Sequence, residues 1–152
     1  GLLCPGLFPV IDPPWYQKVR IALARVYYRY RHFPIPLTVP ELFTATPRWL
    51  DFLRTDPQSL HRASASTFVT SKRLDWFVRS APEKITMPVL LMLAGKDQII
   101  DNDRTKAYFE RFASENKRFI FYPEAHHTLE FEPDPEPFIH DLIGWLAEVP
   151  SR

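Results

Sequence analysis

The chain is 152 residues long, which is enough for one domain with a hydrophobic core. Its 19 basic and 18 acidic residues give a formal net charge of +1, and this balance argues against a nucleic-acid-binding protein, which would need a concentrated basic surface. No run of about 18 apolar residues occurs, so the sequence predicts no membrane-spanning segment.

The N-terminal residues 1–4 are apolar and are followed by Pro5-Gly6, which predicts a short buried strand. The chain opens without an initiator methionine and without the basic segment of a signal peptide, so we expect a fragment of a longer protein. Cys4 is the single cysteine, which excludes a disulfide within the chain and a cysteine-rich metal site. We expect Cys4 to be a small buried side chain and the compartment to be a reducing cytoplasm.

Residues 9–80 are rich in proline and aromatic side chains, and their pattern is mainly helical. A helix is predicted over about residues 15–31, followed by a proline-spaced loop over residues 32–40. Apolar side chains at three- and four-residue spacing define the expected buried face of this helix, which consists of Val19, Ala22, Leu23, Val26, Tyr27 and Tyr30. The arginines around them are predicted to form a solvated face.

Two more helices are predicted in this stretch because a polar residue followed by proline marks each expected start. Thr46-Pro47 opens a short helix that runs to about Leu53, and Asp56-Pro57 opens a longer one that runs to about Arg79. The expected apolar face of the longer helix is Leu60, Ala63, Phe68, Leu74 and Phe77. We interpret residues 9–80 as a helical cap, or lid, rather than as part of the central layer.

After Pro82 the pattern changes to alternating strands and helices. The continuous apolar run over residues 88–94 is typical of a strand that is buried on both faces of a parallel sheet, and residues 118–122 predict a second strand. Helices are predicted over about residues 103–113 and 136–148, with the inward-facing side chains Tyr108, Phe109, Phe112, Phe138, Ile139, Leu142, Trp145 and Leu146. This order of elements implies an α/β fold with right-handed crossovers and a parallel sheet.

Two polar residues follow the predicted strands at their carboxyl ends, where ligands bind in open parallel sheets. Asp97 follows the first of these strands and His127 follows the second. Neighbouring strands would bring the two loops together, and a carboxylate beside an imidazole is the orienting pair of a catalytic triad. The alternative is structural, with Asp97 as a turn residue and His127 bonded to the backbone. Asp101 and Asp103 compete for the acid role, although Asp101 is better placed to cap the following helix.

The sequence around each of these residues resembles the α/β-hydrolase superfamily. Residues 88–101, PVLLMLAGKDQIID, are similar to its seventh strand and acid turn, and residues 123–132, PEAHHTLEFE, are similar to the histidine loop after its eighth strand. The resemblance is closest to the lysophospholipase and monoacylglycerol-lipase-like branch, which also contains serine aminopeptidase-like proteins. It covers residues 82–147 well, and residues 1–6 resemble the sixth strand.

This resemblance implies that the chain is the C-terminal part of an α/β-hydrolase, with the last three strands of the parallel sheet and an inserted helical cap. Residues 1–8 and 81–150 would belong to the core and residues 9–80 to the cap. Asp97 would be the triad acid, and His127 rather than His126 would be the base, because the family's base is the last residue of its small-residue turn. The implied reaction is hydrolysis of a small-molecule, lipid-like carboxylic ester, with no cofactor.

The family's nucleophile elbow, Gly-x-Ser-x-Gly, does not occur in the 152 residues. We therefore expect the chain alone to be inactive, because the attacking atom and the oxyanion-hole donors would lie elsewhere in the parent protein. An aspartate in the elbow would instead indicate a dehalogenase or an epoxide hydrolase, and an inert residue would indicate a non-catalytic binding protein. The group His126, His127, Glu130 and Glu132 matches no zinc signature, so no metal site is predicted.

The cap contains the side chains that we expect to line an acyl-chain pocket, which are Phe33, Leu42, Phe43, Trp49 and Phe52. This expectation follows from the resemblance to lipid-ester hydrolases. The alternative is that these side chains only pack the cap against the sheet.

Overall fold

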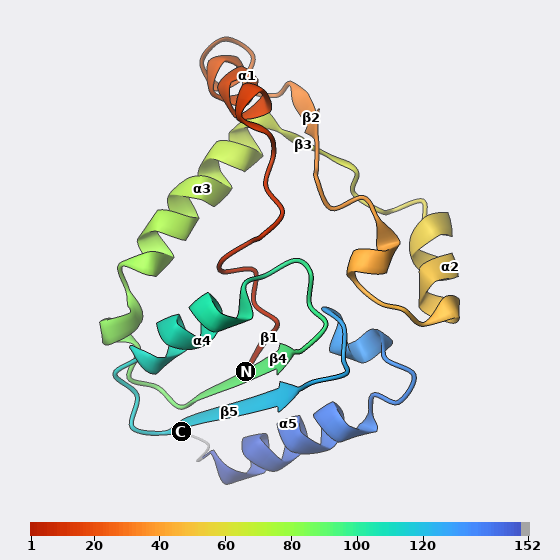
Figure 1. Cartoon of the computed structure of the whole chain (residues 1–152). Helices are drawn as coiled ribbons and strands as arrows, with labels where there is room; N and C mark the ends of the chain where they lie inside the picture. The colour runs from red at the N-terminus through yellow and green to blue at the C-terminus, as the bar shows by residue number, and fades with distance from the viewer. Residues whose placement is uncertain (150–152) are drawn as a thin grey trace.

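A three-stranded parallel sheet in the order β1-β4-β5 forms the centre of the molecule (Figure 1). Its strands are β1 (Leu2–Leu3), β4 (Val89–Ala94) and β5 (Lys117–Tyr122). The computed structural model describes residues 1–149, so Pro150, the last residue of the predicted core range, lies outside the described residues. The predicted α/β class and the three parallel strands are confirmed.

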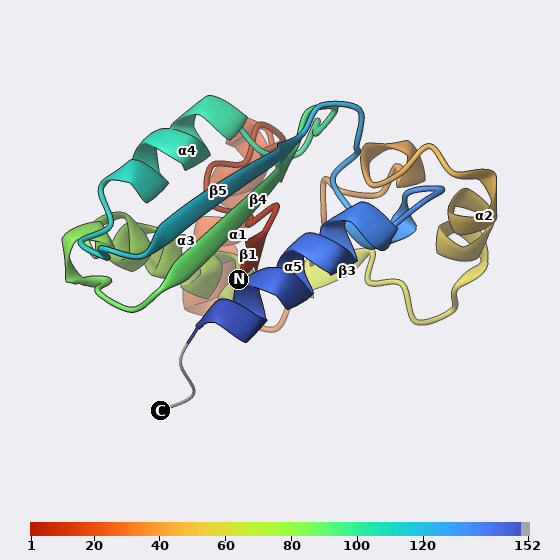
Figure 2. The same ribbon diagram turned by 90° about the horizontal axis from the view of Figure 1, so that it is seen from below.

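Strand β4 occupies the middle of the sheet, and its sequence is apolar throughout. All six of its residues are buried, and Leu91 pairs with Leu2 of β1 on one side and with Phe119 of β5 on the other. Helices α4 (Asn102–Glu110) and α5 (Glu136–Glu148) cover opposite faces of the sheet (Figure 2). Because both faces are covered, no position in β4 needs a polar side chain, which is why a continuous apolar run predicted this strand.

The two covering helices carry most of the inward-facing side chains that the sequence predicted. The buried ones are Tyr108 and Phe109 of α4, Phe112 just after its end, and Phe138 and Trp145 of α5. Half-buried Ile139 and Leu142 pack against the same core. The prediction for Leu146 is wrong, because this side chain is exposed. It follows Trp145 by one position, which turns it about 100° away around the helix axis.

Residues 9–80, which are predicted to form a cap and keep that name below, stand above the sheet (Figure 1). They contain helices α1 (Trp15–Tyr27), α2 (Pro47–Thr55) and α3 (Ala65–Arg79), with a small antiparallel sheet of β2 (His32–Pro34) and β3 (Arg62–Ser64). Short 3-10 turns lie at η1 (Pro40–Leu42), η2 (Pro82–Lys84) and η3 (Leu129–Phe131). Helix α2 confirms the short helix predicted after Thr46. Among residues 1–149, no helix is both long enough and apolar enough to cross a membrane.

The buried face of α1 is not the predicted one. Ile21 and Ala24 are buried in a cluster with Ala65 of α3, whereas all six residues of the predicted face are exposed. Apolar residues occur on every side of this helix, so their spacing does not single out one face. The small side chains of Ala24 and Ala65 allow α1 and α3 to approach closely, and this packing decides which face is buried.

The longer cap helix begins later than predicted. The Asp56 carboxylate accepts a hydrogen bond from the Gln58 backbone amide at 2.9 Å, so it closes a turn instead of capping a helix. Helix α3 begins at Ala65, after Ser64, whose hydroxyl accepts from the Thr67 backbone amide at 3.1 Å. Of the predicted apolar face, Ala63 is buried and Phe68 half-buried, but Leu60, Leu74 and Phe77 are exposed.

The predicted loop over residues 32–40 begins with a strand. Residues His32–Pro34 form β2 and pair antiparallel with β3, with Phe33 opposite Ala63. The pairing covers only three residues and includes a proline, which has no amide to donate. Such a short strand has no alternating pattern long enough to be seen in the sequence.

Candidate active site

Asp97 lies three residues beyond the end of β4, in the turn that leads to α4. Its side chain is fully buried, and both of its carboxylate oxygens accept hydrogen bonds. Oδ1 accepts from the backbone amides of Ile99 at 2.8 Å and Ile100 at 3.1 Å, while Oδ2 faces the ring of His127. Because two backbone amides hold one oxygen, the carboxylate has a single fixed orientation.

His127 lies in the loop after β5, thirty residues further along the chain. Its Nδ1 is 2.8 Å from Asp97 Oδ2, and its side chain is 18% exposed. An ionised carboxylate can only accept a hydrogen bond, so this contact favours the hydrogen on Nδ1, and in the neutral imidazole Nε2 then keeps a free lone pair. The structure thus brings the two residues together in an arrangement that leaves Nε2 able to take a proton.

The turn that carries Asp97 and the loop that carries His127 meet because hydrogen bonding between the β4 and β5 segments continues past the ends of both strands. The Gly95 amide donates to the Tyr122 carbonyl at 2.8 Å, and the Lys96 amide donates to the Ala125 carbonyl at 2.8 Å. A Cβ atom on Gly95 would lie 2.2 Å from the carbonyl oxygen of Pro123, which is far inside van der Waals contact. Glycine at this position is therefore what allows the two loops to touch.

Asp101, the alternative candidate for the acid, caps the N-terminus of α4. Its carboxylate accepts from the Arg104 backbone amide at 2.9 Å, so it is the N-cap that the sequence predicted. Its carbonyl accepts from the Thr105 amide and hydroxyl at 3.0 and 2.7 Å. Asp103 lies in the first turn of the same helix, and its side chain is exposed.

The cap reaches the histidine loop through Phe43. Its carbonyl accepts a hydrogen bond from the Thr128 backbone amide at 3.0 Å. Its ring meets the His127 ring edge-on, with the ring centroids 5.9 Å apart. The residue that follows His127 is therefore held by the cap, and the imidazole has an aromatic neighbour on that side.

Phe131 makes a second set of contacts between the cap and the histidine loop. Its carbonyl accepts hydrogen bonds from the hydroxyls of Thr44 at 3.0 Å and Thr46 at 2.6 Å, and its ring stacks on Trp49 with centroids 4.4 Å apart. Thr44 is fully buried, so its hydroxyl depends on this bond. The sequence placed Thr46 only as the cap of the short helix, but its hydroxyl makes no capping hydrogen bond and donates to Phe131 instead. The bonds of both threonines to Phe131 were not predicted, because their partner lies 85 or more residues away and no local pattern marks it.

The structure brings four of the five expected pocket residues to the side of the histidine loop. The Trp49 ring stacks on Phe131 of that loop, and the Phe52 ring meets the Trp49 ring edge-on with centroids 5.9 Å apart. Leu42 and Phe43 are half-buried against the main core. Phe33 does not join them. It is buried in the separate cap cluster with Ile21, Ala24 and Ala65.

Cys4 follows β1 and lies at the same end of the sheet. Its backbone amide donates to the Met92 carbonyl at 2.9 Å, and its φ of 36° is in the left-handed region. Burial of the thiol, and after it the negative charge of Asp97, raise the pKa of Cys4 from 9.0 to about 12. The side chain is therefore a neutral, buried thiol next to the acid, which confirms the predicted burial.

Cys4 is expected to react slowly with iodoacetamide in the folded protein. The thiolate is the reacting species, and the raised pKa lowers its fraction at about pH 8 on the order of 10³-fold. Because the unfolded thiol ionises first, the free energy of unfolding should fall as the pH rises above about 9. Mass spectrometry of quenched samples follows the labelling, and urea-unfolded protein is the control. Equal rates in the folded and unfolded protein would contradict this account.

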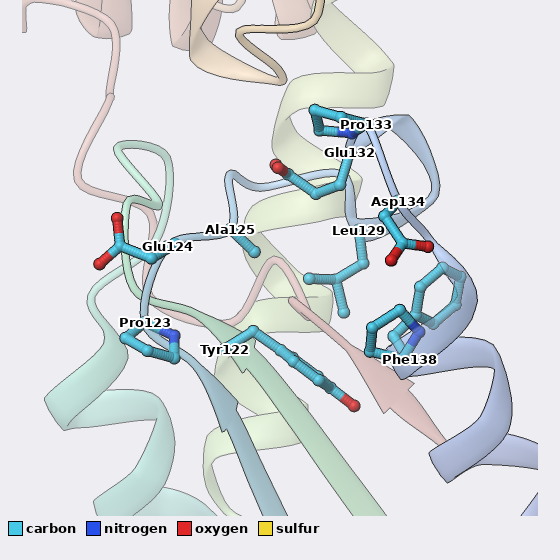
Figure 3. Close-up of a pocket in the computed structure, with 10 residues that line it drawn as sticks. Tyr122, Pro123, Glu124, Ala125, Leu129, Glu132, Pro133, Asp134 and Phe138 are labelled. Carbon is cyan, nitrogen blue, oxygen red and sulfur yellow. The ribbon is translucent and has the colours of Figure 1, made fainter.

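A hollow of about 370 Å³ lies at the junction of the histidine loop and α5 (Figure 3). Its lining is mainly apolar, with Tyr122, Leu129 and Phe138 below and the carboxylates of Glu132 and Asp134 among the residues at its edge. Neither Asp97 nor His127 lines this hollow. We therefore do not assign it to the chemistry of that pair.

Comparison with solved structures shows the fold in which these residues lie. The chain is similar to a monoacylglycerol lipase of Paleococcus ferrophilus, with 21% identity and a TM-score of 0.79 over 95% of this chain and 56% of that one. It is also similar to a soluble variant of monoglyceride lipase from Saccharomyces cerevisiae in complex with a substrate analog, with 18% identity and a TM-score of 0.77 over 97% of this chain and 53% of that one. The fold is therefore part of an α/β-hydrolase fold, and the chain spans about half the length of these structures.

Comparison at the level of sequence gives the family. No curated protein matches the chain. A family model described as serine aminopeptidase, S33, matches residues 2–134, which is most of the chain and includes both Asp97 and His127. The protein therefore belongs to the serine aminopeptidase S33 family of α/β-hydrolases.

Proposed function

We propose that this chain supplies the acid and the base of a serine hydrolase that acts on carboxylic esters. The observation that carries the proposal is the 2.8 Å contact between His127 Nδ1 and the fully buried carboxylate of Asp97, at the carboxyl ends of adjacent parallel strands. A hydrolytic triad needs this pair to set the tautomer of the imidazole. Membership of the serine aminopeptidase S33 family supports the same chemistry.

In the proposed mechanism, His127 Nε2 takes the proton of a serine hydroxyl as the oxygen attacks the ester carbonyl. The tetrahedral intermediate collapses when His127 returns that proton to the leaving alcohol, which leaves an acyl-serine. Water then attacks the acyl group, with His127 again as the base, and releases the acid. Asp97 stabilises the imidazolium at each stage without itself taking the proton.

The serine and the oxyanion-hole donors are proposed to lie outside these residues. The chain contains no Gly-x-Ser-x-Gly elbow, and it spans about half the length of the similar solved structures. Residues 1–8 and 81–150 would form the C-terminal part of the hydrolase core, and residues 9–80 its cap. An acid and a base without an attacking atom have no acyl-transfer chemistry, so residues 1–152 alone should not hydrolyse esters.

The proposed substrate is a small-molecule ester with a lipid-like acyl chain. Leu42, Phe43, Trp49 and Phe52 give the cap an apolar, partly aromatic surface next to the histidine loop. Phe33 would act only by packing the cap, because it is buried away from that loop. The two similar structures are named as monoacylglycerol or monoglyceride lipases, which supports an acyl glycerol or a related ester.

The test is to read the gene upstream of Gly1 and to assay the intact protein. We expect a Gly-x-Ser-x-Gly elbow, release of fatty acid from a monoacylglycerol, and loss of this activity in His127→Ala. The 152-residue chain serves as the inactive control. An aspartate in the elbow would replace the proposal with dehalogenase or epoxide chemistry, and the absence of any nucleophile would make the protein a binding protein.

A further inference from the structure

A second histidine–carboxylate pair lies beside the first. Glu132 Oε1 accepts two hydrogen bonds from His126, one from its backbone amide at 2.7 Å and one from ring Nδ1 at 2.9 Å. Both side chains are largely buried, at 18% exposure for His126 and 17% for Glu132. Figure 3 shows the Glu132 side chain reaching back from the far end of the loop toward the segment that follows Ala125. A single oxygen atom thus closes the loop across six residues.

We propose that Glu132 is a positioning residue for His127, an inference that rests on the proposed role of His127 as the base. His126 immediately precedes His127, so fixing the amide and the ring of His126 fixes the start of the peptide that carries the catalytic imidazole. The amide on the other side, that of Thr128, is bonded to the Phe43 carbonyl at 3.0 Å. The backbone on both sides of His127 is therefore held by a specific acceptor.

This second pair is not equivalent to the first. The Asp97 carboxylate is fully buried and uses one oxygen for the turn and the other for the imidazole. The Glu132 oxygen that meets the His126 ring is shared with a backbone amide, so it cannot act on the ring alone. An oxygen that is shared between a backbone amide and a ring holds the two ends of the loop together. An oxygen that bonds only to the ring, as Asp97 Oδ2 does to His127, controls the tautomer of the imidazole. Glu132 is accordingly assigned to the position of the loop and not to proton transfer.

Glu132→Ala, Glu132→Gln and the control Glu130→Ala test this assignment in the intact protein. Glu130 carries the same charge in the same loop, but its side chain is exposed. In Glu132→Ala, hydrogen exchange of the His126 amide should accelerate on the order of tenfold to a hundredfold, because a hydrogen bond to a charged acceptor is lost. The NMR signal of the His127 Nδ1 proton should broaden as its distance to Asp97 becomes variable.

The kinetic effect should appear in kcat and not in KM. A misplaced base slows the chemical step, so kcat should fall by about tenfold to a hundredfold in Glu132→Ala while KM stays within about twofold. Glutamine keeps an acceptor oxygen at the same reach, so Glu132→Gln should recover most of kcat, and Glu130→Ala should match the wild type. A melting temperature close to that of the wild type shows that each variant is folded.

Three results would overturn the inference. The first is an unchanged His127 Nδ1 signal in Glu132→Ala, the second is an equal loss in both Glu132 variants, and the third is an equal loss in Glu130→Ala. The NMR and exchange measurements need no substrate, so they decide the role of Glu132 even if the protein has no esterase activity. Loss of the proposed function would instead appear as an inactive wild-type protein with an intact Glu132 effect on the loop.

Discussion

Replacing Asp97 by asparagine is expected to lower kcat for the proposed ester hydrolysis by the intact protein about 10⁴-fold while leaving the fold in place. The asparagine oxygen can still accept from the amides of Ile99 and Ile100, so the turn keeps its hydrogen bonds. The side-chain nitrogen then faces His127 Nδ1, and a donor opposite a donor drives the ring to its other tautomer. In that tautomer Nε2 carries the hydrogen and cannot accept the proton of the nucleophile. Steady-state kinetics measure the effect, and KM should change little.

Asp101→Asn is the matched control for this experiment. The change is the same and lies four residues away, and asparagine caps a helix as well as aspartate does, so activity and melting temperature should stay near those of the wild type. Since Asp97 and His127 would act as one unit, the double variant Asp97→Asn/His127→Ala should be about as slow as His127→Ala alone. If Asp97→Asn kept more than about a tenth of wild-type kcat, Asp97 would not be the triad acid.

The parallel sheet and the meeting of its two loops were predicted correctly because they follow from the burial of strand β4. The run over residues 88–94 has no polar side chain, which places it inside a sheet, and a parallel sheet with one helix between its strands brings the next loops to the same edge. The close approach of Asp97 and His127 needs only that strand order and the resemblance around each residue. It does not depend on the details of the cap.

The parts that sequence reasoning missed depend on contacts that residue spacing does not mark. The face of α1 is chosen by the small side chains of Ala24 and Ala65, which lie in different helices. The hydroxyl of Thr44 is satisfied by a carbonyl 87 residues away, and Glu132 closes its loop by accepting from a backbone amide. The partners of Thr44 and Glu132 are backbone groups, which have the same chemistry at every position, so no residue type identifies them in the sequence.

Gly95→Ala is expected to destabilise the protein by about 3 kcal/mol or more and to separate the two loops of the site. The added Cβ would lie 2.2 Å from the Pro123 carbonyl oxygen and 2.7 Å from the Pro123 carbonyl carbon, and both are backbone atoms that no side-chain rotation can move away. Relief requires the backbone after β4 to shift away from the loop after β5. The amide bonds from Gly95 to Tyr122 and from Lys96 to Ala125 would then lengthen, and with them the contact between Asp97 and His127.

Gly144→Ala separates this steric effect from the general effect of replacing a glycine. Gly144 lies inside α5, and apart from its own stretch of the helix a Cβ there would meet no atom within 4 Å. Alanine should therefore raise the free energy of unfolding by about 0.5–1 kcal/mol through its higher helix propensity. Urea unfolding of both variants should therefore give shifts of opposite sign. The His127 Nδ1 signal should be lost or broadened in Gly95→Ala and unchanged in Gly144→Ala. If the Gly95→Ala variant kept wild-type stability and an intact His127 Nδ1 signal, this account would be contradicted. It would mean that Gly95 does not lie as close to Pro123 as the 2.2 Å between the added Cβ and the Pro123 carbonyl oxygen implies.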